Sequence, residues 1–418
     1  MKLMKAGAVF GGMTLTALLG TVHIILPFTL LLLLQKMFGD LNDTSPREGC
    51  PCTKRRSLRR AYRCAVDAVA FGWFTCAAAL LELVGRTSIR ISGPFTTDDR
   101  VVLLICNHHS RVDWMYIWCM CAHLGVTRRL KIALKGSLRK VPLFGWAMQS
   151  FLFIFLSRAD RDADLASLTD TLWHMCAWGD DTWVLIFPEG TDLSPKNKQL
   201  SDEHADAKGI ARYRHVLHPR SAGFVVAVNT LWDRLDAVYD LTIRYENPAA
   251  VAGSEDPRPS EKWMLKGVFP RAVHVSAERF PKRELPSDPE SCATWLAARW
   301  KIKELEMQEA ADGAADEPKA PAASSRWCLA GKYYGTFVAW AVLLATLVLY
   351  FPGVFPGPTG FLVRSLVGMA VFELITRYFG GIDALEKAIW PPPTTRPAAP
   401  AVVKAAAAAP TTTAAPLL

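Results

Sequence analysis

The chain alternates between long stretches without charge and stretches in which charged and apolar residues mix. Residues 6–34 hold no ionisable side chain except His23, and about 20 apolar residues suffice to cross the core of a bilayer. We expect an uncleaved anchor here, because the small-residue cleavage site of a signal peptide is not evident. Pro27 and the pair Gly11-Gly12 leave two forms open, one long tilted span or a kinked, re-entrant helix pair.

Three further apolar runs extend this pattern. Residues 61–84 form the second run, and because Asp67 and Glu82 interrupt it, both a full span and an interfacial helix stay open. Six basic residues lie before or at the start of this run: Lys54, Arg55, Arg56, Arg59, Arg60 and Arg63. Such a cluster favours the cytoplasmic side of a membrane and attracts anionic headgroups. Residues 333–351 and 360–379 flank a Pro/Gly cluster, which predicts a C-terminal membrane hairpin.

The middle of the chain has a different pattern. Between residues 89 and 286, four short apolar runs rich in β-branched residues occur at 101–105, 182–187, 224–228 and 241–245. Each run is continuous rather than alternating, which is typical of strands buried on both faces. Helical segments such as 162–178 separate them. We therefore predict the α/β class, a mixed sheet covered by helices, with membrane helices at both ends of the chain.

These patterns divide the chain into five parts. Residues 1–87 would hold the N-terminal membrane-anchoring helices and the basic segment, and 88–290 the α/β domain. A helix and a linker would follow in 291–330, and the membrane hairpin in 331–380. Residues 381–418 end in repeated Pro, Ala and Thr, so we expect a disordered tail.

Composition narrows the class of function. The 418 residues are 51% hydrophobic and 21% charged, which is too apolar for a disordered scaffold. A formal net charge of +9 suits an anionic partner such as a lipid surface or a phosphorylated substrate. Nucleic acid is disfavoured as a partner because no groove-reading module is recognisable. The ten cysteines lack zinc-site spacing, so we expect reduced thiols and no metal centre.

Candidate chemistry follows the first predicted strand. His108 and Asp113 lie five residues apart, a spacing that would set them roughly 140° apart in a continuous helix. They can meet if His108 lies in the turn after the strand and Asp113 in the first helical turn. Asp113 would then fix the imidazole tautomer and leave the other ring nitrogen to take a proton from a substrate hydroxyl. A purely structural hydrogen bond is the alternative, and His109 is the alternative base.

Three more blocks accompany this pair. They are K-G-S-L-R-K-V-P-L-F-G-W-A-M-Q at 135–149 with a following S-R at 157–158, F-P-E-G-T-D at 187–192, and V-L-H-P-R at 216–220. With N-H-H-S-R-V-D at 107–113, the four blocks in this order resemble the glycerolipid (lysophosphatidate-type) acyltransferase family over residues 88–283. The similarity is strongest to its branch of lysocardiolipin acyltransferases and eukaryotic 1-acylglycerol-3-phosphate O-acyltransferases. The resemblance implies a glycerol-3-phosphate acyltransferase-like fold.

The resemblance also implies roles for individual residues. His108 would be the general base and Asp113 its orienting partner. The acceptor site would draw on six residues: Lys135, Arg158, Glu189, Gly190, Thr191 and Arg220. One position departs from many relatives, which carry Arg after F-P-E-G-T where this chain has Asp192. The acceptor phosphate would then need Arg220, Lys135, Arg139 or Arg158, and Asp192 should disfavour a phosphomonoester unless an arginine neutralises it.

The function implied by the resemblance is acyl-CoA-dependent O-acylation of a lysophospholipid. Acyl-CoA would be a co-substrate, the lysophospholipid and the lipid bilayer would be partners, and no cofactor or metal would be required. We expect an integral protein of the endoplasmic reticulum with its active site facing the cytosol, because the anchor lacks an Arg-rich transit peptide. A CoA-independent transacylase and a non-catalytic membrane scaffold stay open as alternatives. A hydrolase is disfavoured because no G-x-S-x-G elbow is present.

Overall fold

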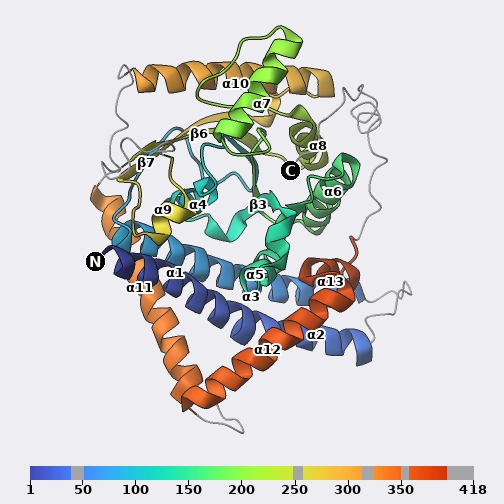
Figure 1. Ribbon diagram of the computed structural model, residues 1–418. Helices are drawn as coiled ribbons and strands as arrows, with labels where there is room; N and C mark the ends of the chain where they lie inside the picture. Colours follow the sequence, from blue (N-terminus) through green and yellow to red (C-terminus); the bar gives the residue numbers. More distant parts are fainter. Residues whose placement is uncertain (39–50, 248–257, 313–322, 350–356, 393–418) are drawn as a thin grey trace.

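A central sheet with helices on both faces organises the protein (Figure 1). The computed structural model describes residues 1–38, 51–247, 258–312, 323–349 and 357–392. Within them the sheet has seven strands in the order β1-β7-β6-β2-β5-β3-β4. The strands are β1 (Ser88–Ser92), β2 (Val101–Cys106), β3 (Leu130–Lys135), β4 (Ile154–Leu156), β5 (Thr182–Ile186), β6 (Ala237–Glu246) and β7 (Ala272–Pro281). Neighbouring strands are parallel except β6 and β7, so the predicted mixed α/β sheet is confirmed.

Both faces of the sheet are buried. Along β2, Val102 and Leu104 enter one hydrophobic cluster, and Leu103 and Ile105 enter another. The first cluster is shared with α3 (Pro51–Ala79), α4 (Asp113–Leu124) and α5 (Phe144–Ser150). The second is shared with α6 (Arg161–Trp178), α8 (Ser221–Leu231) and α10 (Pro289–Ala311). This double burial explains why the strand sequences are continuous apolar runs.

Two further helices, α7 (Pro195–Lys208) and α9 (Glu261–Leu265), also lie on connections between strands. The remaining short elements are the 3-10 turns η4 (Thr127–Arg129), η5 (Gly136–Lys140) and η7 (Lys282–Glu284). Because β2, β5 and β6 are parallel, their carboxyl ends share one edge of the sheet. Ligands of open α/β sheets bind outside that edge.

One predicted strand is wrong. Residues 224–228 belong to helix α8, in which Phe224, Val225 and Val228 are buried against the sheet. A run of five apolar residues fits a buried strand and a buried helix equally well, and only its length separates the two. The helix extends this run to eleven residues, from Ser221 to Leu231.

The N-terminal segment is one continuous helix rather than a re-entrant pair. Helix α1 (Lys2–Leu18) continues through the π-helical turn η1 (Leu19–Ile25) into α2 (Leu26–Phe38). Helix α3 continues into a second π-helical segment, η3 (Leu80–Val84). The two long helices run in opposite directions, because Gly12 lies against Leu80 and Gly20 lies against Val69. Glycine lets helix backbones approach closely at such contacts.

The C-terminal part forms the predicted hairpin and then returns to the domain. Its helices are α11 (Ala323–Leu349) and α12 (Gly357–Phe379). The expectation of a disordered tail from residue 381 is wrong at its start, because Ile382–Ile389 form helix α13 with Ile382, Leu385 and Ile389 buried. Residues 393–418 of that tail and residues 313–322 of the expected linker lie outside the described part of the chain. Helix α10 packs on the sheet through Leu296 and Trp300, so it belongs to the α/β domain.

Part of the basic cluster is buried, contrary to the expectation that it meets headgroups. Arg59 donates two hydrogen bonds to Asp180, at 2.8 and 2.6 Å. Arg63 donates to Glu386 at 3.1 Å and to Asp67 at 2.8 Å. The sequence could not show this pairing, because Glu386 lies more than 300 residues away.

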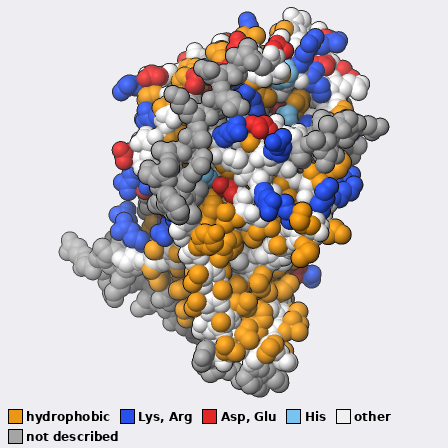
Figure 2. Space-filling model, turned by 90° about the vertical axis from the view of Figure 1, so that its left-hand side faces the viewer, with side chains coloured by type: hydrophobic (Ala, Val, Ile, Leu, Met, Phe, Trp, Pro, Cys, Tyr) orange, Lys and Arg blue, Asp and Glu red, His pale blue; other side chains and the backbone are white. Residues whose placement is uncertain are grey.

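Within the described residues, four helical segments are long and apolar enough to cross a membrane: Lys2–Leu34, Arg56–Val84, Gly331–Leu349 and Gly357–Phe379. Their apolar side chains stay largely exposed on α11 and α12, for example Val338, Val342 and Leu366. Figure 2 shows hydrophobic side chains gathered on the lower part of one face, below a zone that carries Lys and Arg. These features indicate membrane association.

Candidate active site

The turn after β2 is tied to the neighbouring strand by a side-chain amide. Asn107 donates from Nδ2 to the carbonyl of Ile243 at 3.1 Å, and its Oδ1 accepts from the Ile243 N–H at 2.8 Å. The amide thus continues the β2–β6 pairing by one step after β2 has ended. The next residue, His108, is left in the turn at the carboxyl edge of the sheet.

His108 and Asp113 meet as the sequence predicted. The distance from Nδ1 of His108 to Oδ2 of Asp113 is 2.9 Å. Asp113 is buried and is the first residue of α4, so the helix N-terminus favours its negative charge. The same oxygen accepts the Ser110 N–H at 2.9 Å. With Nδ1 donating to the carboxylate, Nε2 is the nitrogen that can accept a proton, and no hydrogen bond to it is found among the described residues.

Two aromatic residues that sequence reasoning missed complete this pair. Tyr245, near the end of β6, donates its hydroxyl to Oδ1 of Asp113 at 2.5 Å. Phe187 stacks on the His108 ring, with centroids 4.3 Å apart. His109, the alternative base, lies beside the Tyr245 ring, with centroids 5.5 Å apart. The only sequence signal for Tyr245 was its place at the end of the predicted strand 241–245.

Glu189, one of the predicted acceptor-site residues, is buried and accepts hydrogen bonds from three parts of the chain. One carboxylate oxygen accepts from the His108 N–H and from Nε1 of Trp300, both at 3.2 Å. The other accepts from the Leu217 N–H at 3.2 Å. Burial raises the pKa of Glu189 to about 7, and the charge of His108 and these hydrogen bonds offset burial only in part. Glu189 therefore joins the β2 turn, the fourth sequence block and α10.

Gly190 and Arg220 lie together at the end of β5. Gly190 has a φ of +77°, which favours glycine, and a side chain there would contact the Arg220 side chain at about 3.5 Å. Arg220 also donates its backbone N–H to the Pro188 carbonyl at 2.7 Å. Thr191 accepts from Nδ2 of Asn197 at 2.8 Å. The third and fourth sequence blocks are thus brought together beside His108.

The four predicted cations differ in their surroundings. Arg158 follows β4 and lies near Arg220. Loss of hydration lowers the pKa of Arg158, and the like charge of Arg220 adds to this effect. Lys135 is exposed at the end of β3. Arg139 is not available to a phosphate, because it donates to both oxygens of Asp383 at 2.9 and 2.6 Å. Both terminal nitrogens of Arg139 are therefore held by Asp383 of α13.

Asp192 is neutralised by arginines that the sequence did not single out. Its carboxylate accepts from Arg258 at 3.2 Å and lies 3.6 Å from Nε of Arg111. Within the described residues, no hydrogen bond or ion pair joins Arg220 to this carboxylate. The sequence left open that an arginine neutralises Asp192, and Arg258 and Arg111 do so here.

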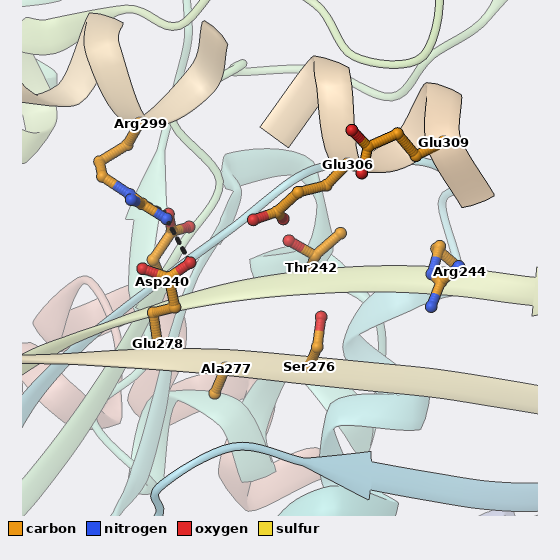
Figure 3. Close-up of a pocket in the computed structure, with 9 residues that line it drawn as sticks. All are labelled: Asp240, Thr242, Arg244, Ser276, Ala277, Glu278, Arg299, Glu306 and Glu309. Atoms are coloured by element: carbon orange, nitrogen blue, oxygen red, sulfur yellow. Dashed lines mark hydrogen bonds and ion pairs between the residues drawn. The ribbon is translucent and has the colours of Figure 1, made fainter. Parts of the chain in front are cut away.

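A cavity of about 260 Å³ lies elsewhere, between α10 and strands β6 and β7 (Figure 3). Asp240, Thr242 and Arg244 of β6 line it, and Glu306 and Glu309 of α10 reach it from the other side. Its buried wall is an ion-pair cluster in which Asp240 binds Arg299 at 2.8 Å and Lys303 at 2.6 Å. None of the predicted site residues lines this cavity. No group of three metal-binding side chains is found within the described residues.

Comparisons with known proteins match the region that holds the four sequence blocks. A family model described as "Acyltransferase" matches residues 88–246, and one described as "Acyltransferase C-terminus" matches residues 263–310. "Lysocardiolipin acyltransferase 1" of Danio rerio is 37% identical over 67% of this chain and 70% of its own length. The Mus musculus protein of the same name is 33% identical over 76% of this chain and 82% of its length. "Lysophosphatidylinositol acyltransferase 10" of Caenorhabditis elegans is 31% identical over 66% and 69%, respectively.

Proposed function

Because the chain belongs to the glycerolipid acyltransferase family and is an acyltransferase, we propose that it transfers an acyl group from acyl-CoA to the free hydroxyl of an anionic lysophospholipid. The single observation that carries the mechanism is the hydrogen bond between Nδ1 of His108 and Asp113 at 2.9 Å. It leaves Nε2 as the proton acceptor at the carboxyl edge of the sheet, where substrates of α/β folds bind.

The reaction follows from this geometry. Nε2 of His108 takes the proton of the acceptor hydroxyl as its oxygen attacks the thioester carbonyl carbon. The tetrahedral intermediate then expels CoA thiolate as the C–S bond breaks, and the imidazolium returns the proton to the sulfur. Asp113 stabilises the transient imidazolium and fixes the ring, helped by Tyr245. A thioester is already activated, so the proposed step requires no cofactor or metal.

The remaining predicted residues act around this step. Glu189 is a positioning residue, because it holds the His108 backbone and the Leu217 backbone. Gly190 and Thr191 shape the turn beside Arg220, and Arg158 and Arg220 supply positive charge for the acceptor's glycerol phosphate. Lys135 is exposed at the same edge of the sheet and can reach anionic headgroups. The relatives named above act, by their names, on lysophospholipids with different headgroups, which supports a lysophospholipid acceptor here.

The test uses the purified full chain in detergent micelles with acyl-CoA and a panel of lysophospholipids, and measures CoA release and acylated product. We expect His108→Ala to lower kcat by roughly 10²–10⁴, the usual contribution of a general base. His109→Ala tests the choice of base and should keep most activity, and His204→Ala on the exposed face of α7 is the matched control.

Product formed from a phospholipid donor without acyl-CoA would identify a transacylase instead. Equal activity of folded His108→Ala and wild type would contradict the mechanism.

We also propose that the enzyme resides in the endoplasmic reticulum with His108 on the cytosolic side, where acyl-CoA is made. The four long apolar helices support membrane residence. An Arg212→Cys variant places a reporter on the exposed segment after α7. A membrane-impermeant maleimide should label it from the cytosolic side of intact microsomes. Labelling only after the membrane is opened would contradict this orientation.

A further inference from the structure

The Asp192 carboxylate organises a pair of arginines next to the catalytic turn. Asp192 is buried, with 7% of its surface exposed. Arg258 donates to its Oδ2 at 3.2 Å, and Nε of Arg111 lies 3.6 Å from its Oδ1. The Arg111 side chain is 70% exposed. Its charge therefore faces solvent, although Asp192 contacts its Nε atom.

This arginine pair is attached to the backbone around His108. Arg258 donates a second hydrogen bond to the His109 carbonyl at 3.3 Å. The next residue, Pro259, accepts a hydrogen bond from the Ser110 hydroxyl through its carbonyl. Leu193, which follows Asp192, donates its N–H to the His108 carbonyl at 2.8 Å. The three segments that carry Asp192, Arg111 and Arg258 therefore meet at the turn that holds the base.

The other arginines of the site approach from the opposite side. Arg258 belongs to the connection between β6 and β7, and Arg158 to the loop after β4. The sheet order β6-β2-β5-β3-β4 places the end of β5, with Gly190 and Asp192, between these two connections. Arg220 lies against Gly190. The site thus offers cations on both sides of the β5 turn.

Resting on the proposed function, we infer that Arg111 and Arg258, held by Asp192, bind a second phosphate of the acceptor lipid. Arg158 and Arg220 would take the phosphate on the glycerol that is acylated. Guanidinium groups bind phosphate with several directed N–H donors, and a carboxylate partner fixes their orientation. Asp192 therefore acts as a positioning residue, and the preferred acceptor is a lysophospholipid that carries two phosphates rather than one.

A matched pair of acceptors tests this inference. Lysocardiolipin and lysophosphatidylglycerol share a phosphodiester-linked glycerol headgroup, and lysocardiolipin adds the second phosphate with its own glyceride. Steady-state kinetics with acyl-CoA would be measured for both acceptors in the same mixed micelles. The variants are Arg111→Gln and Arg258→Gln, and Arg212→Gln is the matched control because Arg212 forms an exposed ion pair with Asp206 on α7.

We expect each site variant to lower kcat/KM for lysocardiolipin about tenfold, mainly through KM, as expected for the loss of one charge-assisted hydrogen bond. The value for lysophosphatidylglycerol should change less than about threefold, and Arg212→Gln should match wild type with both. Equal losses with both acceptors, or no loss with either, would overturn the inference. So would a wild type that acylates lysophosphatidylglycerol but not lysocardiolipin, and the proposed function would survive that result. Failure to transfer from acyl-CoA to any lysolipid would reject the proposed function itself.

Discussion

Two regions of this molecule pair arginines with carboxylates and differ in how the charges are matched. In the first, Arg59 and Arg63 of α3 lie buried between the α/β domain and α13. In the second, Arg111 and Arg258 lie around Asp192 at the carboxyl edge of the sheet. The sequence assigned Arg59 and Arg63 to a headgroup-binding cluster and did not single out Arg111 or Arg258.

The difference lies in how the positive charges are matched. Glu386, with 1% of its side chain exposed, contacts both buried arginines, and Asp180 and Asp67 take one more contact each. In the first region, carboxylates of the protein itself therefore neutralise both arginines. The ion pairs with Glu386 attach α13 to the α/β domain. At the sheet edge, Asp192 is shared by two arginines, while Arg158 and Arg220 lie close by. The first region should therefore govern stability, and the second should govern substrate preference.

The largest effect should come from removing Glu386, which pairs with the buried Arg59 and Arg63. Glu386→Ala leaves Arg63 and Arg59 buried without their shared carboxylate, and removing one partner of a buried ion pair costs about 3–5 kcal/mol. We expect a large fall in the Tm of the purified protein, with no change in the ratio of acceptors used by the fraction that stays folded. Asp206→Ala breaks the exposed pair with Arg212 and should leave Tm unchanged. An unchanged Tm for Glu386→Ala would remove the distinction between the two regions.

The second effect concerns the sheet edge, where Asp113→Asn keeps the shape of the side chain but removes its charge. The amide no longer stabilises an imidazolium at His108, so we expect kcat to fall on the order of 10²-fold, less than for His108→Ala. The Tm should change little compared with Glu386→Ala. A variant that loses stability but retains kcat would show that Asp113 is structural, which is the alternative that the sequence left open.

The sequence predicted the parts of this fold that depend on local pattern. The buried strands 101–105 and 182–187, the long apolar helices and the His108–Asp113 contact all follow from residues close together in the chain. The exception, 224–228, is a short apolar run, for which a buried helix and a buried strand have the same pattern.

The remaining features depend on contacts across long separations. Tyr245 reaches Asp113 from 132 residues away, and Arg258 reaches Asp192 from 66. Nothing in the local sequence distinguishes Arg258 or Arg63 from a solvated arginine. A carboxylate that arrives from another element decides the role of each.

The two regions also differ in the pKa of their buried carboxyl groups, Glu189 at the sheet edge and Glu386 on α13. Burial also acts to raise the pKa of Glu386, but Arg63, His174 and Arg59 hold it at about 2, whereas Glu189, with mainly N–H partners, rises to about 7. A raised pKa means that the folded state binds the proton more tightly than the unfolded state. The stability contributed by Glu189 is complete below about pH 4.5 and is lost as pH rises through about 7.

We therefore expect the Tm of wild type, relative to Glu189→Gln, to fall as pH rises from 5 to 8. The corresponding change in the free energy of unfolding is on the order of 1–3 kcal/mol. Thermal unfolding in a pH series measures it, with Glu203→Gln on the exposed face of α7 as a control that should follow wild type. A difference that is constant across the series would show that Glu189 keeps one charge state, as Glu386 is expected to do.

The smallest effect is a change in acceptor preference at Asp192. Asp192→Arg removes the counter-ion of Arg111 and Arg258 and adds a third positive charge beside them. The arginine pair should separate, while the extra charge favours a phosphomonoester dianion. At surface-like dielectric a charge change at several ångströms is worth on the order of 1–4 kcal/mol, and exposure at the site places this case at the low end. We expect the ratio of kcat/KM for lysophosphatidate to that for lysocardiolipin to rise several-fold. Asp192→Asn removes the counter-ion without adding a cation, so it should lower the use of lysocardiolipin without raising that of lysophosphatidate. A wild type that strongly prefers lysophosphatidate, with the same ratio in both variants, would show that this edge of the sheet does not read the headgroup.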